Sequence, residues 1–238
     1  MKLETLRSRL SHRFPEALPR PDLQTDVAPF GIPEVDALLS RGGLARGRLS
    51  EIVGAIGSGR TSLVRSLVRT APGPVALVDT DGTLAPSDWV RDGVCTWIVR
   101  ADGLFAADIL LRSRSFGLVV VFGATGRRNS PVVRLQRLAE ESAAVCVFVG
   151  ESPQGSSLVT TRLAVTGGEF LTAGIPPVLA GRRVAVRLEK GGPHRTVEIV
   201  LHEEETDRLL AHPEAPDRAL VAWRGAGGRK QAPRFARG

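Results

Sequence analysis

The segment GAIGSGRTS, residues 54–62, contains the residue types that bind phosphate. It fits the pattern of a glycine, four residues, a second glycine, lysine and then serine or threonine, except that Arg60 replaces the lysine. Glycines let backbone N–H groups converge on an anion, and the start of a following helix adds partial positive charge. A tight turn without a ligand is the alternative. The predicted phosphate-binding set is Gly54, Gly57, Ser58, Gly59, Arg60, Thr61 and Ser62.

Arg60 and the neighbouring strands argue against catalysis at this loop. The compact ammonium of lysine fits between phosphates, whereas a guanidinium is planar and bulkier. We therefore expect no resident cofactor and at most weak ATP binding. A magnesium site would also need a carboxylate at the end of a neighbouring central strand, but the strand predicted over 117–123 ends in Phe122 and Gly123. The sequence predicts no metal site.

The acids that remain near this edge follow other strands. Asp79 and Asp81 come after the apolar run VALV, and Glu151 follows VCVFVG. Asp81 is a candidate for orienting water and equally for capping its loop. Glu151 is a candidate sensor of the site or a solvated loop residue. We expect both acids to be vestigial and assign neither as a catalytic residue.

Strands and helices alternate around the loop. A buried strand over 48–54 precedes it and an amphipathic helix over 60–70 follows. Because the later strands are nearly unbroken apolar runs, they predict an α/β fold with a mostly parallel sheet covered on both faces. Further elements are expected as a short helix over 31–39, a helical turn around Trp89, strands over 74–79, 95–100, 117–123 and 145–150, helices over 103–115 and 130–143 (capped by Ser130), and an antiparallel edge of strands over 157–165, 182–190 and 194–202 with turns at Gly167–Gly168 and Gly191–Gly192.

The composition of the 238-residue chain divides it into three parts. Residues 1–30 are expected to form a short helix over 3–10 and a proline-rich tether, residues 31–202 the core, and residues 203–238 a flexible charged tail. No apolar run is long enough for a membrane span, so we expect a cytoplasmic protein. Cys95 and Cys146 are expected to be free, buried thiols. The net charge of +7 suits nucleic acid or an acidic partner.

Residues 30–68, FGIPEVDALLSRGGLARGRLSEIVGAIGSGRTSLVRSLV, resemble the start of the RecA recombinase core. The most specific points are Gly31, Asp36, the run Gly42–Leu44, Glu51–Ile52 and the glycine-rich loop. A weaker likeness continues to about residue 200. The resemblance implies a RecA-like P-loop core.

The same resemblance implies that catalytic positions have been lost. The phosphate-binding lysine of the family falls on Arg60, the magnesium-site aspartate on Phe122 and the catalytic glutamate on Asp81. The acid that contacts adenine falls on Ala85, and the glutamine that links the γ-phosphate to DNA falls on Glu151. Since losing one electrostatic stabiliser costs roughly a hundred- to a thousandfold in rate, several losses together imply a protein that no longer hydrolyses ATP.

A short, degenerate RecA-like chain is similar to ImuA, an accessory factor of damage-induced (SOS) mutagenesis and translesion synthesis. This likeness implies a non-catalytic adaptor that binds RecA and the polymerase-like protein ImuB, and through them an error-prone DNA polymerase complex. Two other functions stay open. One is a weak DNA-stimulated ATPase that uses Arg60 and Asp81, and the other is a division inhibitor similar to SulA, which would bind FtsZ.

The two ends supply the candidate partner-binding residues. The N-terminal segment would engage RecA, or it is a frayed terminus that covers its own sheet. The tail could place aromatic side chains in a partner groove with arginines on the rim, bind DNA weakly through its basic residues, or only solubilise the chain. The residues concerned are Leu3, Leu6, Leu10 and Phe30 at one end, and Trp223, Arg224, Arg229, Lys230, Arg234 and Phe235 at the other.

Overall fold

The computed structural model describes residues 27–71, 73–89, 95–123, 129–153, 157–173 and 178–202. The predicted helix over 3–10, its tether and the charged tail lie outside these ranges. The partner-binding roles of Leu3, Leu6, Leu10 and the six tail residues therefore stay predictions.

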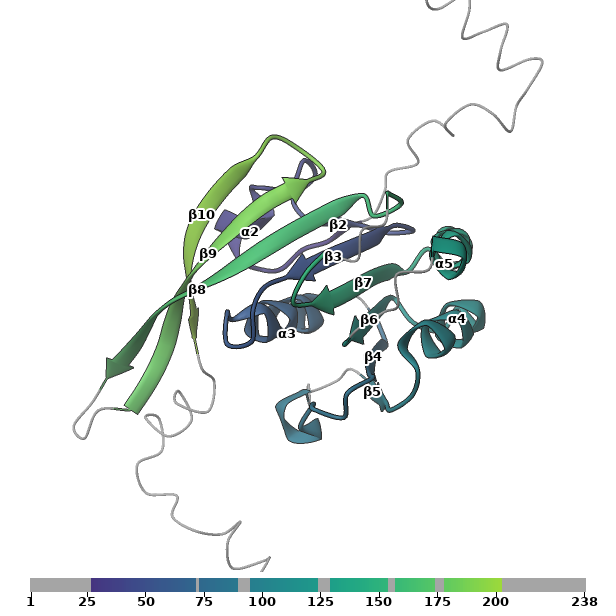
Figure 1. Ribbon diagram of the computed structural model, residues 1–238, viewed down its shortest axis with the longest axis horizontal. Coiled ribbons are helices and arrows are strands. Elements are labelled where there is room, and N and C mark those ends of the chain that lie inside the picture. The colour runs from purple at the N-terminus through teal and green to yellow at the C-terminus, as the bar shows by residue number, and fades with distance from the viewer. Residues whose placement is uncertain are drawn as a thin grey trace, which may run out of the picture. The chain divides into compact units, whose positions relative to one another are not determined.

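An eight-stranded sheet forms the centre of the fold, in the order β10-β9-β8-β3-β7-β6-β4-β5 (Figure 1). Neighbours from β8 to β5 pair in parallel, and the arrows of β8, β9 and β10 alternate in direction. This confirms the predicted α/β fold, a mostly parallel sheet with an antiparallel edge. The strands are β3 (Leu49–Val53), β4 (Val75–Asp79), β5 (Thr96–Val99), β6 (Leu118–Phe122), β7 (Val145–Gly150), β8 (Thr161–Ala173), β9 (Val178–Lys190) and β10 (Arg195–His202).

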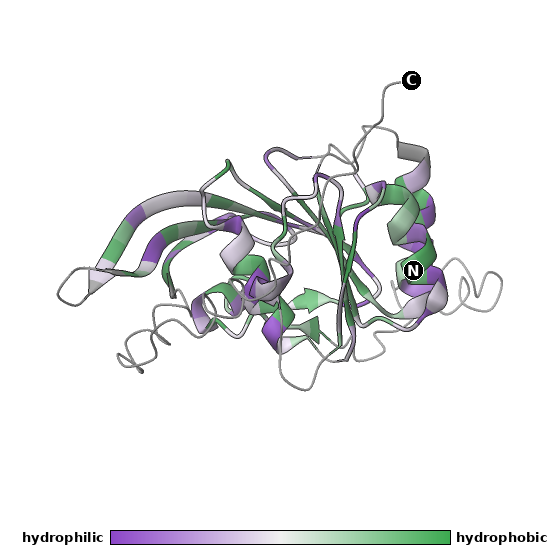
Figure 2. Cartoon of the chain, turned by 90° about the horizontal axis from the view of Figure 1, so that it is seen from below, coloured by the Kyte–Doolittle hydropathy of each residue, from purple (hydrophilic) through white to green (hydrophobic). Residues whose placement is uncertain are grey.

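Helices cover both faces of the sheet, as the apolar strands predict. One buried cluster joins α3 to one face of the central strands, and a second joins α4 and α5 to the other face. Figure 2 shows green residues along the strands and purple ones on the outward sides of the helices. The helical elements are α2 (Pro33–Asp36), the 3-10 helix η1 (Pro86–Trp89), α3 (Arg60–Thr70), α4 (Gly103–Ser113) and α5 (Asn129–Ser142), and a small separate sheet pairs β1 (Val27–Ala28) with β2 (Leu44–Ala45).

Two local predictions are wrong. The helix expected over 31–39 is only four residues long and continues as turns. The helix expected over 130–143 is present and begins one residue earlier, at Asn129, and the capping role of Ser130 stays a prediction. Gly167–Gly168 is not a turn but lies inside β8, whereas Gly191–Gly192 does lie between β9 and β10.

Gly168 has a packing role that explains the error. A Cβ atom at this position would lie 2.4 Å from the carbonyl oxygen of Arg183. Glycine therefore allows β8 and β9 to approach closely, which is a known use of glycine inside strands.

Residues 170–182 belong to a second compact unit, distinct from the one that contains the sheet's centre. Within this unit, Phe170 is 60% exposed and the guanidinium of Arg182 lies over its ring, 4.5 Å from the centroid.

The two cysteines are both free, as predicted, but only Cys146 is buried. Burial raises the pKa of the Cys146 thiol to about 12, so this group stays protonated at neutral pH. Cys95 is exposed and accepts a hydrogen bond from the Trp97 indole at 2.8 Å. None of the helices in the described ranges is long and apolar enough to cross a membrane.

Candidate functional site

The glycine-rich loop lies where the sequence predicts it, between the end of β3 and the start of α3. The Gly54 N–H donates to the Gly150 carbonyl at 3.1 Å, which ties the loop to the end of β7. Gly57 and Gly59 have φ angles of 77° and 93°, in the left-handed region that favours glycine. The backbone thus has the tight turn and helix start that an anion site requires.

Two of the loop glycines are also needed for packing. A Cβ atom on Gly54 would lie 2.4 Å from the Val165 carbonyl oxygen and 2.5 Å from the Ser58 hydroxyl. One on Gly59 would lie 2.9 Å from a methyl group of Val184. The core itself therefore demands this loop shape, whether or not a ligand binds.

The Arg60 side chain turns back onto the loop that it ends. Its guanidinium Nη1 donates to the carbonyl oxygen of Gly54, and its backbone N–H donates to the Ser58 hydroxyl at 3.4 Å. The Arg60 guanidinium thus forms a hydrogen bond with a backbone carbonyl group of its own loop. Thr61 and Ser62 lie half-buried in the first turn of α3, and Ile56 is 81% exposed in the loop.

Asp79, the first acid after β4, has a structural role. Its buried carboxylate accepts hydrogen bonds from the backbone N–H groups of Thr83 and Leu84, at 2.9 and 3.1 Å. The Arg100 guanidinium lies 3.6 Å from the same carboxylate. Asp79 therefore holds the loop after β4 in place and is not available to a ligand.

Asp81 and Glu151 are both exposed at the carboxyl edge of the sheet. A Cβ atom on Gly123 would lie 2.9 Å from a carboxylate oxygen of Asp81, so Asp81 reaches the end of β6. Glu151 follows β7, the strand between β3 and β6. Among the interactions of the described residues, neither carboxylate bonds to the loop at 54–62. The structure brings Arg60, Gly54 and Ser58 together, but it does not join them to either acid.

An aromatic cluster occupies the end of β6. Phe122 is 7% exposed and meets the Trp89 ring edge-on, with 5.5 Å between ring centroids. Trp89 itself is 3% exposed and lies under the Arg65 guanidinium of α3, 5.7 Å from the ring centroid. Apolar packing thus fills the end of β6, where a magnesium site would need a carboxylate. Sequence reasoning singled out Phe122 and correctly expected a helical turn around Trp89, but it did not predict that Trp89 packs on Phe122.

Phe30, a predicted partner-binding residue, is 1% exposed and belongs to the core. Its backbone N–H donates to the Asp36 carboxylate at 2.7 Å, and that of Gly31 donates to the same carboxylate at 3.0 Å. The prediction took Phe30 as part of an extended tether, but this turn directs its ring inward.

No protein-family model matches the chain. Part of the chain is similar to proteins named RecA: that of Salinispora arenicola is 34% identical over 112 residues, which cover 43% of this chain and 32% of that protein. The RecA of Streptomyces avermitilis is also 34% identical over 112 residues, and the match covers 30% of that protein. The RecA of Thermus aquaticus is 39% identical over 69 residues, or 28% of this chain and 20% of that protein. The matched region spans about a third or less of these relatives. These matches and the sheet support a RecA-like core.

Proposed function

We propose that this chain is a non-catalytic, RecA-like adaptor in damage-induced mutagenesis, and that it binds RecA and an ImuB-type, polymerase-like partner. The observation that carries this proposal is the packing of Phe122 on Trp89. A metal-bound nucleotide needs carboxylate or water oxygens at this end of the sheet, and an aromatic pair offers none. The Arg60 hydrogen bond to Gly54 supports the same conclusion, because it uses the loop's cation within the protein.

Exposed apolar side chains on the opposite face of the sheet from α3 support a protein partner there. Phe105 and Ile109 lie one turn apart on α4 and are 66% and 51% exposed. Trp97, on the edge strand β5, is 55% exposed. It lies two residues before Val99, which packs into the α4–α5 core, so the two side chains share a face of the sheet. Exposed aromatic residues are typical anchors of protein interfaces.

The first experiment measures equilibrium binding of the labelled full-length chain to purified RecA at physiological salt, with FtsZ as comparator. We expect binding to RecA alone. Phe105→Ser should weaken the binding to RecA by about tenfold or more, because buried aromatic anchors contribute most of the binding energy of an interface. Phe170→Ser is the matched control, because Phe170 is similarly exposed but lies in the other unit. Binding to FtsZ in place of RecA would favour the division-inhibitor alternative and overturn the proposal.

Restoring the loop lysine should not restore hydrolysis. In Arg60→Lys, the aromatic pair still occupies the end of β6, so we expect ATP turnover to remain at background. Turnover is measured by phosphate release with and without single-stranded DNA, with RecA as a positive control. Robust turnover by this variant would show that the loop cation was the missing element, and the non-catalytic proposal would then fail.

The weak ATPase is the second candidate, and the position of Asp81 favours it. Its carboxylate lies beside Gly123, close to where a water-orienting acid would be needed. DNA-stimulated turnover by the unmodified chain that is lost in Asp81→Asn would establish this alternative.

A further inference from the structure

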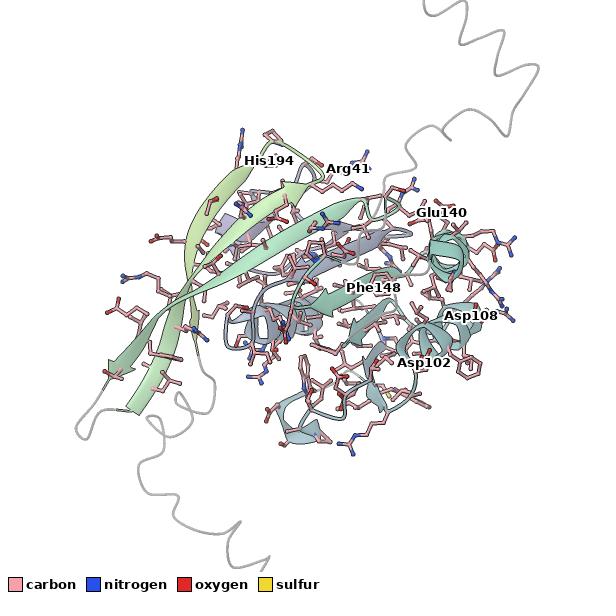
Figure 3. All side chains as sticks on the ribbon, viewed as in Figure 1. Arg41, Asp102, Asp108, Glu140, Phe148 and His194 are labelled. Atoms are coloured by element: carbon pink, nitrogen blue, oxygen red, sulfur yellow. The ribbon has the colours of Figure 1, made fainter. Side chains whose placement is uncertain are left out.

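Four arginines surround a hollow on the outer surface of α4 and α5. Arg112 and Arg114 come from the end of α4, and Arg134 and Arg137 from α5. The hollow has a volume of about 310 Å³. Figure 3 shows nitrogen-tipped side chains gathered outside these helices, beside Asp108. We call this cluster of four the arginine seam.

Two carboxylates hold the arginine seam in place. Asp108 lies 3.1 Å from Arg112 and 2.6 Å from Arg134. Glu141 lies 3.6 Å from Arg114 and 3.3 Å from Arg137. Four guanidinium groups against two carboxylates leave two positive charges. The four side chains are 51–74% exposed, so their remaining N–H donors face solvent.

Two leucines lie at the bottom of the hollow. Leu111 and Leu138 line it and are 1% and 6% exposed as whole residues. A ligand that suits this site has carboxylates for the arginine forks and a small apolar group for the floor. A guanidinium group can bind a carboxylate with two parallel hydrogen bonds. The ion pairs with Asp108 and Glu141 already hold the four guanidinium groups at fixed distances from one another.

We propose that the arginine seam binds an acidic segment of a protein partner, one in which carboxylates flank an apolar side chain. A nucleic acid backbone is a poorer fit, because its phosphates bring no apolar group to the leucines at the bottom of the hollow and because its regularly spaced charges are matched by a longer basic stripe than four arginines provide. This inference goes beyond the proposed function and does not depend on RecA being the partner.

The test is fluorescence polarisation of the full chain with a labelled peptide in which two glutamates stand on each side of one leucine. We expect saturable one-to-one binding, and none to the same peptide with glutamines in place of glutamates. The double variant Arg114→Ala/Arg137→Ala should bind about tenfold more weakly, from the loss of two charged contacts. Arg195→Glu, an exposed change on β10, is the control and should alter binding little.

Further variants separate the alternatives. Arg114→Lys/Arg137→Lys keeps the positive charge but loses the planar pair of N–H donors that fits a carboxylate. This variant should therefore also bind the peptide more weakly. If single-stranded DNA displaces the peptide and also binds the lysine variant equally well, the arginine seam binds phosphate groups and the proposal is wrong. If the peptide binds only after Glu203, Glu204 and Glu205 are changed to glutamine, the chain's own acidic segment is the occupant and no separate partner is needed. Unchanged melting temperatures exclude unfolding as the cause.

Discussion

Trp89→Ala is expected to lower the free energy of unfolding by about 3–5 kcal/mol, the usual cost of removing a large buried aromatic side chain. Trp89 is 3% exposed and packs between Phe122 of β6 and the Arg65 guanidinium of α3. Its removal would leave a cavity and would also remove an edge-on aromatic contact and a cation–π contact. Urea denaturation followed by circular dichroism measures the change.

Trp97→Ala is the matched control. Trp97 is 55% exposed, so although it meets Phe116 edge-on at 6.0 Å between centroids, more than half of its surface stays in solvent. We expect its loss to cost about 1 kcal/mol or less. Equal losses in the two variants would mean that the cluster at the end of β6 is not tightly packed. The argument that this cluster displaces a metal site would then lose its basis.

Arg162→Ala is expected to destabilise the fold by about 3–5 kcal/mol, because it removes the guanidinium that pairs with a buried carboxylate. Glu51 of β3 and Arg162 of β8 are paired directly across the two strands. Arg162 Nε donates to the Glu51 carboxylate at 2.7 Å, and the Glu51 side chain is fully buried. The cost arises from desolvation of the remaining charge and not from the loss of one contact.

An exposed ion pair provides the comparison. Arg48 lies 2.6 Å from Glu140, and both side chains are 48% exposed, so Arg48→Ala should cost at most about 1 kcal/mol. The double variant Glu51→Leu/Arg162→Met should lose less stability than Arg162→Ala alone, because the buried carboxylate is then removed together with its guanidinium. If the double variant is the less stable of the two, Glu51 is held by other groups and the desolvation argument fails.

The alternation of elements could be predicted from sequence because each central strand is buried on both faces. Runs such as VALVD in β4 and LVVVF in β6 are fully buried, so their apolar character has only one explanation. The glycine-rich loop was equally clear, since its pattern lies between a strand and a helix. Errors occurred where a residue has two uses. Glycine marks turns and also close strand contacts, and only the pairing of β8 with β9 shows that Gly168 is the second kind.

The details of the site depend on side-chain directions, which a sequence pattern does not contain. Arg60 could equally have extended outward, and its bond to Gly54 is visible only in three dimensions. Trp89 is brought to Phe122 by the loop after β4, whose path depends on the two hydrogen bonds to Asp79. Phe30 was misplaced for the same reason, because the turn held by Asp36 brings its ring into the core.

The bond between Arg60 and Gly54 has a consequence for regulation. In a nucleotide switch, the ligand favours one conformation of the loop by completing contacts that the empty protein lacks. Here the chain completes the contact itself, so a nucleotide would have to break it before gaining any of its own. An adaptor built this way would hold the same shape whatever the cell's ratio of ATP to ADP. Its availability would then follow from how much of it is made and from its partners, not from metabolic state.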